Sequence, residues 1–378
     1  MLPPSPRLKL SLAGLSALIA LFAVEAVLRV TKPLKVPLRS RIFTARVADG
    51  RAVELPSMPM ARGLQRSDPR LEFELAPSLS FEIRYDAGEQ TKHPYMRFED
   101  GWFILDVETN AAAMRGPMPA LERDASVRRV ACIGDSFTFG DGVNFEDTWV
   151  AGLGSAFESA GGLQALEVLD FGVPGYESGD IALQLEDKVL PLKPDLVVYG
   201  MVLNDPTLRT DPELNRLGEA AAAALLETIQ PHTGLARLSH IAALIQTRQR
   251  MRKLEATYRR FVRARFSKES ASWQAFVEDL EHMQALTAAA DAKLIVCIFP
   301  LLDSLVADYP FTAQHKQVEQ ACAKLGIPAV NLLSAFDGQR AADLWVHPTD
   351  QHPNPRGHQL AQAAIAKALA SREDELVP

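Results

Sequence analysis

Five short apolar runs recur between residues 129 and 332, and segments with helical spacing lie between them. The runs span residues 130–133, 166–171, 195–200, 293–299 and 327–332. Continuous apolar runs of this length, rich in β-branched residues, are typical of strands that are buried on both faces. Their alternation with helical segments predicts a parallel sheet that is covered by helices on both faces.

Helical patterns fill most of the remaining chain after residue 145. They cover about residues 146–159, 179–190, 219–230, 239–266 and 312–325, and a last helix begins after Asn354. Asn354 is expected to cap that helix, with Pro355 at its first position. The long helical stretch over about residues 206–290 indicates an insertion before the fourth strand.

A small β-rich segment is predicted ahead of the first of these strands. Residues 71–75 and 79–85 alternate apolar with polar side chains, and residues 102–105 form a further candidate strand. Residues 31–60 hold four prolines among basic and polar residues, which indicates a tether. The β-rich segment could pack against the α/β domain, line one wall of its cleft, or decorate the surface without a role in binding.

The first thirty residues contain an apolar stretch of nearly membrane-spanning length. Between Lys9 and Arg29 the only charged residue is Glu25, and a helix over about residues 8–30 would be long enough to span. We favour an uncleaved anchor over a cleaved signal peptide, because Val24-Glu25-Ala26 is a poor processing site. Basic residues flank both ends, so the positive-inside rule does not decide the orientation.

Composition narrows the classes of function. The chain of 378 residues carries a formal net charge of -7, with a pI near 5.7, which gives no general case for nucleic-acid binding. Three cysteines are too few for a disulfide framework, and Cys132 and Cys297 fall inside apolar strand runs. Residues 239–266 are rich in arginine, and we prefer a solvated face for them over a surface for anionic lipid or an acidic polymer.

The first apolar run leads into Gly134-Asp135-Ser136, where chemistry can be expected. Glycine permits a sharp turn, and Ser136 then lies at the carboxyl end of a strand, where open α/β sheets bind ligands. Backbone N–H groups close to such a serine can stabilise an oxyanion. Taken alone, the same three residues are also typical of a turn that merely connects a strand to a helix.

Three later segments favour the chemical interpretation. They are Gly172-Val173-Pro174-Gly175-Tyr176, Gly200-Met201-Val202-Leu203-Asn204-Asp205 and Asp350-Gln351-His352-Pro353-Asn354. Together with Gly134-Asp135-Ser136, they resemble in order and spacing the four signature blocks of the SGNH (GDSL-type) hydrolase family. The resemblance covers about residues 125–370. It implies the SGNH hydrolase fold, a flavodoxin-like three-layer α/β/α sandwich with a five-stranded parallel sheet.

The expected organisation follows from the anchor, the β-rich segment and this resemblance. We expect an N-terminal tail with a transmembrane helix over residues 1–30, and a linker with the small β-rich segment over residues 31–125. The SGNH hydrolase domain is expected over residues 126–372, with the helical insertion at about 206–290. Family members with an N-terminal anchor usually hold the catalytic domain outside the cytoplasm, so we expect a periplasmic or cell-surface location.

A serine hydroxyl is a poor nucleophile until a base takes its proton. The candidate base for Ser136 is His352, with Asp350 to orient and charge-stabilise the imidazole, as in a catalytic triad. His347 and His358 are rivals. His358 falls on the last helix, where capping or packing is the commoner task, and His347 precedes a proline in a loop.

The acid departs mildly from the family pattern. The family usually places it three residues before the histidine, which here is Thr349, whereas Asp350 lies two residues before. It stays open whether Asp350 reaches Nδ1 of His352 or only shapes the loop, and Asp343 is a second candidate.

The resemblance also implies three oxyanion donors. They are the backbone N–H of Ser136, the backbone N–H of Gly175 and the side-chain amide of Asn204. Gly172, in the same loop as Gly175, is an alternative donor. Asp135 and Asp205 are expected to hold these loops through hydrogen bonds to backbone N–H groups.

No metal and no cofactor are expected. The C-terminal histidines lack an H-E-x-x-H or paired-cysteine signature, and no nucleotide-binding fingerprint occurs. We therefore expect a serine esterase that hydrolyses acyl esters, acetyl esters among them, of an extracytoplasmic carbohydrate or lipid. One alternative is an O-acyltransferase that uses the same triad on a polysaccharide, and another is a catalytically silent binding or assembly protein.

Overall fold

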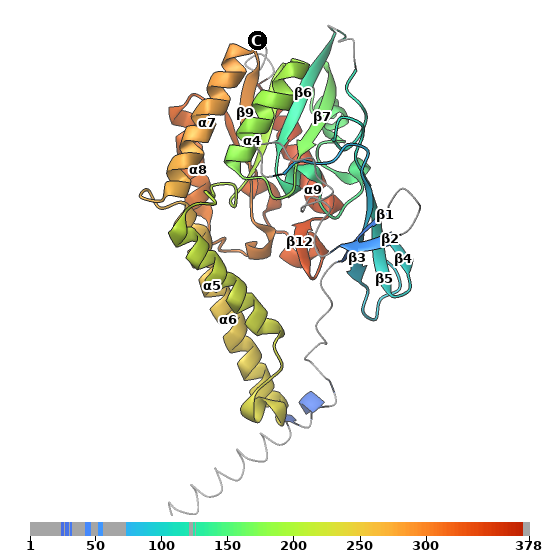
Figure 1. The fold of residues 1–378 in the computed structure, drawn as a ribbon, viewed down its shortest axis with the longest axis vertical. Helices are drawn as coiled ribbons and strands as arrows, with labels where there is room; N and C mark the ends of the chain where they lie inside the picture. Colours follow the sequence, from blue (N-terminus) through green and yellow to red (C-terminus); the bar gives the residue numbers. More distant parts are fainter. Residues whose placement is uncertain are drawn as a thin grey trace, which may run out of the picture. The chain divides into compact units, whose positions relative to one another are not determined.

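A parallel sheet forms the centre of the α/β domain (Figure 1). Its strands, in chain order, are β6 (Val127–Gly134), β7 (Ala165–Gly172), β8 (Leu196–Val202), β9 (Lys293–Phe299) and β10 (Ala329–Asn331). They lie in the order β10-β9-β8-β6-β7, and each neighbouring pair is parallel. This is the flavodoxin-like strand order, so the predicted five-stranded parallel sheet is confirmed.

The computed structural model describes residues 24–25, 27–29, 31, 42–46, 52–55, 73–120, 124 and 126–372. The chain divides into two compact units. The larger consists of Leu38–Leu214 and Val262–Pro378, and the smaller consists of Met1–Pro37 and Asn215–Phe261.

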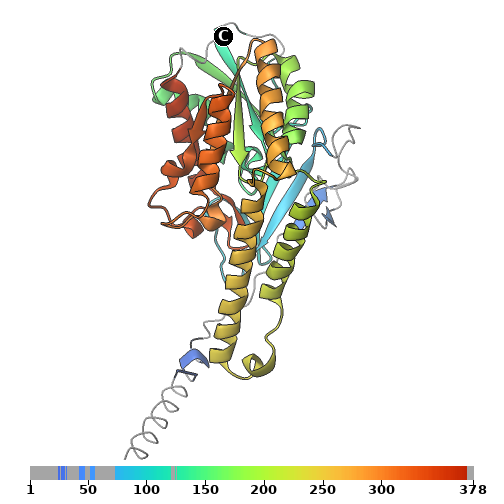
Figure 2. The same ribbon diagram turned by 90° about the vertical axis from the view of Figure 1, so that its left-hand side faces the viewer.

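Helices cover both faces of the parallel sheet (Figure 2). On one face α4 (Ser178–Gln184) packs against α7 (Ala271–Ala289), and on the other α3 (Leu153–Ser159) packs against α9 (Pro355–Ala370). Helix α8 (Thr312–Lys324) connects β9 to β10 and contacts both strands. The start of α9 is as predicted, since the Asn354 side chain accepts a hydrogen bond from the Gly357 N–H, and Pro355 follows.

Two predicted helices differ from the structure. The helix predicted over residues 146–159 is wrong in its first half, where a 3₁₀ turn, η1 (Phe145–Asp147), precedes α3. The intervening Trp149 is fully buried, and its indole N–H donates to the Phe137 carbonyl at 3.1 Å. Burial of this ring, rather than helical spacing, therefore sets the local backbone. The segment predicted as one helix over 179–190 ends its α-helical part at Gln184 and continues as a π-helical turn, η2 (Leu185–Val189).

The predicted β-rich segment is a second, antiparallel sheet in the larger unit. Its strands are β1 (Ile42–Arg46), β2 (Ala52–Leu55), β3 (Ser80–Asp86), β4 (Arg97–Glu99) and β5 (Trp102–Glu108), in the order β2-β1-β3-β5-β4. The strand predicted over 71–75 is wrong in its described part, residues 73–75. There the Phe73 carbonyl instead accepts a hydrogen bond from the Tyr176 hydroxyl at 2.9 Å, so this backbone serves a loop contact.

The smaller unit contains most of a helical hairpin. Helices α5 (Pro212–Ile229) and α6 (His240–Arg265) are joined by a loop with a 3₁₀ turn, η4 (Gly234–Arg237). The Glu25 carboxylate accepts hydrogen bonds from His240 N at 2.9 Å and Ile241 N at 3.1 Å, at the start of α6. These bonds place a carboxylate at the N-terminus of α6, where the helix dipole favours negative charge.

Most of the predicted anchor, residues 8–30, lies outside the described residues. Within the described part of the chain, no helix is both long enough and apolar enough to cross a membrane.

Candidate active site

The backbone at the end of β6 presents Ser136 at the edge of the parallel sheet. Gly134 ends the strand with a φ of 153°, and a Cβ there would lie 2.3 Å from Thr138 Oγ1 and 2.7 Å from the Gly200 carbonyl oxygen. Only glycine fits that turn without displacing its neighbours. Asp135 then caps the short helix α2 (Ser136–Phe139). Strand order reverses between β6 and β8, so Ser136 lies where such sheets open to a ligand.

The structure brings Ser136, His352 and Asp350 into one hydrogen-bonded chain. His352 Nε2 lies 2.8 Å from Ser136 Oγ, and His352 Nδ1 lies 2.5 Å from Asp350 Oδ1. His352 and Asp350 both belong to β12 (Asp350–Pro353), which pairs with β11 (Trp345–His347) just before α9. Asp350 therefore reaches Nδ1 of His352 in the structure, although it lies two residues before the histidine rather than three.

The rival residues point elsewhere. His347 Nε2 lies 3.1 Å from the Asp86 carbonyl oxygen, and its Nδ1 lies 2.8 Å from Thr349 Oγ1. His358 Nδ1 accepts a hydrogen bond from the Trp149 N–H, and burial lowers the pKa of His358 to about 3. His358 therefore stays neutral and packs in the core, as its place on the helix predicts.

A second carboxylate, which the sequence analysis did not single out, also lies near the base. Asp141 Oδ2 is 3.9 Å from His352 Nδ1, and the Asp141 side chain is 1% exposed. Arg115, itself buried, donates to the carbonyls of Phe139, Gly140 and Val143 and so holds the loop that carries Asp141. No sequence pattern marks these residues, since their positions follow from how the loop after α2 is packed.

The three residues predicted as oxyanion donors, Ser136, Gly175 and Asn204, follow the ends of three neighbouring strands of the parallel sheet. Asn204 follows β8, and its amide nitrogen donates to Asp135 Oδ2 at 3.1 Å, which fixes the amide near Ser136. Gly175, in the loop after β7, has a φ of 85°. The alternative, Gly172, is less suitable, because its N–H donates to Asp170 Oδ1 at 2.8 Å.

The two loop aspartates act as predicted. Asp135 Oδ1 accepts from the Phe137 N–H at 2.9 Å, and Asp205 Oδ2 accepts from the Val202 N–H at 3.1 Å and from the Tyr199 hydroxyl at 2.7 Å. Burial raises the pKa of both carboxyl groups. Their hydrogen bonds offset part of that cost and hold the loops that carry Ser136 and Asn204.

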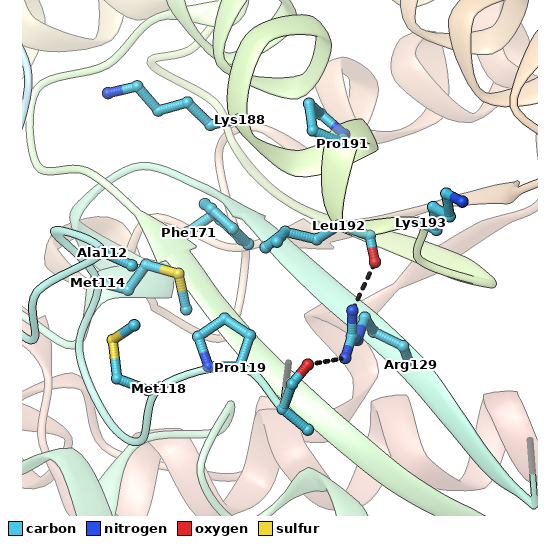
Figure 3. A pocket seen from close by; sticks show the side chains of 11 residues that line it. Ala112, Met114, Met118, Pro119, Arg129, Phe171, Lys188, Pro191, Leu192 and Lys193 are labelled. Atoms are coloured by element: carbon cyan, nitrogen blue, oxygen red, sulfur yellow. Dashed lines mark hydrogen bonds between the residues drawn. The ribbon is translucent and has the colours of Figure 1, made fainter. Parts of the chain in front are cut away.

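A separate pocket of about 600 Å³ runs beside β6 and β7 (Figure 3). Its lining includes Met114, Met118 and Phe171, and Arg129 crosses it to donate to the carbonyls of Leu192 and Ala120. Ser136 and His352 do not line it, so it is not where an ester would meet the nucleophile. In the described part of the chain, no group of three or more His, Cys, Asp or Glu side chains is arranged to hold a metal.

Residues 132–360 match the GDSL-like lipase/acylhydrolase family, and the chain belongs to this family of ester-bond hydrolases. The predicted SGNH/GDSL membership is thus confirmed. No curated protein matches the chain.

Several solved structures are similar over most of their own length. LAE5, an α/β hydrolase from the metagenome of Lake Arreo, is 18% identical, with 64% of this chain and 96% of that chain covered and a TM-score of 0.41. TesA is 16% identical, with 64% and 98% covered and a TM-score of 0.40. A catalytic mutant of Axe2, an acetylxylan esterase from Geobacillus stearothermophilus, is 14% identical, with 63% and 92% covered and a TM-score of 0.40. Because these sequence identities and TM-scores are low, the assignment of the chain to its family rests on the match of residues 132–360 to the family model.

Proposed function

We propose that this protein is a serine esterase in which Ser136 is the nucleophile, His352 the general base and Asp350 the acid that orients His352. The observation that carries the proposal is the continuous chain from Ser136 Oγ through both ring nitrogens of His352 to Asp350 Oδ1, with distances of 2.8 and 2.5 Å. The Ser136–His352 distance is within the range expected for a nucleophile and its base, and the His352–Asp350 contact is a short hydrogen bond between the base and its orienting acid.

The reaction proceeds in two acyl-transfer steps. Ser136 Oγ attacks the ester carbonyl carbon while His352 Nε2 takes the hydroxyl proton, and the carbonyl oxygen becomes an oxyanion. His352 then returns the proton to the departing alkoxide, which leaves an acyl group on Ser136. A water molecule, activated by the same nitrogen, attacks the acyl-enzyme and releases the acid. Asp350 stabilises the imidazolium that forms in each step.

Three donors stabilise the oxyanion in this proposal: the N–H groups of Ser136 and Gly175 and the amide of Asn204. One N–H of the Asn204 amide donates to Asp135 Oδ2, which holds the amide in one orientation, and in this proposal the second N–H donates to the oxyanion. Such preorganised donors stabilise charge that develops only in the transition state.

Replacing Asn204 with alanine should therefore lower kcat by roughly 10²–10³-fold with little change in KM. Steady-state kinetics with a chromogenic ester would measure both constants, and thermal unfolding would check the fold. If kcat were unchanged and KM raised, Asn204 would instead bind the ground state of the substrate.

The substrate class we propose is an acyl ester of a carbohydrate or lipid outside the cytoplasm, with acetyl as one candidate acyl group. The N-terminal apolar stretch is near membrane-spanning length and supports attachment to a membrane. The side of the membrane is proposed from the family, whose members with an N-terminal anchor usually hold the catalytic domain outside the cytoplasm. The membrane-attached hydrolase would then act on esters at the cell surface or in the periplasm.

A screen of the full-length chain against p-nitrophenyl esters from acetyl to long acyl groups, and against acetylated polysaccharides, tests this function. Turnover should occur with at least one ester and should vanish in Ser136→Ala. Hydrolysis that persisted in Ser136→Ala, or inertness of the wild type to every ester, would contradict the proposed function. Transfer of the acyl group to a polysaccharide hydroxyl, with little free acid, would identify a transferase.

A further inference from the structure

A buried tyrosine from the antiparallel sheet contacts the acid of the proposed triad. The Tyr85 hydroxyl donates a hydrogen bond to Asp350 Oδ2 at 2.8 Å, and the Tyr85 side chain is 0% exposed. The other carboxylate oxygen, Oδ1, lies 2.5 Å from His352 Nδ1 and also accepts a hydrogen bond from the His352 backbone N–H at 3.2 Å. Asp350 is thus held from both sides, by the base on one oxygen and by Tyr85 on the other.

The position of Tyr85 is itself fixed by β3. This strand lies in the middle of the antiparallel sheet, between β1 and β5, and Tyr85 is in register with Phe103 of β5. At the next residue, the Asp86 carbonyl oxygen lies 3.1 Å from His347 Nε2, which ties β3 to β11. The His347 and Tyr85 rings also lie with their centroids 5.2 Å apart.

Space for the hydroxyl depends on a glycine in the loop after α2. Gly142 has a φ of 87°, and a Cβ there would lie 2.8 Å from the Tyr85 hydroxyl oxygen and 2.7 Å from Val346 Cγ1. Three segments that are distant in sequence therefore converge on one hydroxyl: β3, the loop around Gly142, and the β11–β12 hairpin.

The chemistry of the acid explains what this contact can do. A triad carboxylate must keep one oxygen on the imidazole nitrogen through the whole reaction, because it fixes the tautomer and stabilises the imidazolium. Asp350 is 4% exposed, so solvent offers its second oxygen little support. A hydrogen bond to a charged group is about twice as strong as one between neutral groups, which makes the Tyr85 hydroxyl an effective support.

We propose that Tyr85 is a positioning residue for the hydrolase reaction: its hydroxyl holds Asp350 against His352, so that the antiparallel sheet supplies part of the active site. This inference rests on the proposed function, in which His352 is the base. In this proposal Tyr85 acts through Asp350, the carboxylate that its hydroxyl contacts.

Tyr85→Phe tests the proposal while keeping the buried ring. It should lower kcat for p-nitrophenyl acetate by about 10-fold, the effect of one hydrogen bond to a charged group, with KM changed less than about twofold. Tyr309→Phe is the matched control, because it removes a buried tyrosine hydroxyl that contacts Leu301 N rather than the triad. The control should leave kcat within about twofold of the wild type.

A double-mutant cycle separates positioning from packing. In an Asp350→Ala background, adding Tyr85→Phe should change kcat by less than about twofold, because the residue through which Tyr85 acts is gone. If Tyr85→Phe lowered kcat by the same factor in both backgrounds, the tyrosine would act through packing of the sheet and the proposal would be overturned. An unchanged kcat in the single variant would overturn it equally.

A spectroscopic measurement keeps this test independent of turnover. The proton on Nδ1 of His352 should give a downfield NMR signal that is absent from His352→Ala. In Tyr85→Phe, but not in Tyr309→Phe, that proton should exchange faster with water, because Asp350 is released. If the wild type were inert to every ester, the proposed function would fail, yet this signal would still decide the role of Tyr85. An exchange rate unchanged by Tyr85→Phe would refute the positioning role.

Discussion

Replacing His352 with alanine should lower kcat/KM for ester hydrolysis by about 10⁴–10⁶-fold while the fold stays intact. His352 Nε2, 2.8 Å from Ser136 Oγ, is the group placed to take the hydroxyl proton. Without it, the serine must be deprotonated by water, and only the oxyanion donors and substrate binding still accelerate the reaction. Steady-state kinetics with the best ester of the screen would measure the loss, and circular dichroism with thermal unfolding would check the fold.

His347→Gln is the matched control for this loss. His347 lies on the same hairpin, five residues before His352, but its Nε2 faces the Asp86 carbonyl rather than Ser136. We expect kcat/KM to fall by less than about 10-fold in this variant. The assignment of the base would be wrong if His347→Gln were the more damaging substitution, or if Ser136→Ala and His352→Ala each left most of the activity.

The sheet could be predicted from the sequence because its strands are buried on both faces. All seven residues of β8 are buried, and a continuous apolar run is the direct consequence of that environment. The region before α3 could not be predicted in the same way. There, the burial of Trp149 against Phe137 decides the backbone, and this contact joins two elements that a local pattern does not relate.

The candidate site also contains residues that the sequence marks and a residue that it does not. Ser136, Asn204 and His352 could be singled out as candidates because they lie in short motifs that resemble the signature blocks of the family. Tyr85 could not, because it is one more aromatic residue in a strand, and its partner Asp350 is 265 residues away. The alternation that predicts β3 tells which face of the strand is buried, but not which buried group will meet a polar atom.

A fluorophosphonate should label the protein once, at Ser136. Such reagents phosphonylate a serine whose proton is taken by a base, with loss of fluoride, and Ser136 is the hydroxyl that His352 reaches. Labelling should disappear in Ser136→Ala, fall almost completely in His352→Ala, and fall less severely in Asp350→Ala, since the acid orients the base and does not attack. Intact-mass spectrometry would count the adducts, and peptide mapping would place them.

The pH dependence of the labelling rate should report the base itself. A protonated imidazole cannot accept the serine proton, so the rate should fall as the pH falls through the titration of His352. Burial lowers the pKa of His358 to about 3 and lowers that of His347, so neither should account for the fall. Asp170 needs its own control, because burial raises its pKa to about 7. In Asp170→Asn the labelling rate should still fall at low pH, as it does in the wild type. Labelling that stayed constant down to pH 5, or that persisted unchanged in His352→Ala, would rule out His352 as the base and leave Ser136 without an activating partner.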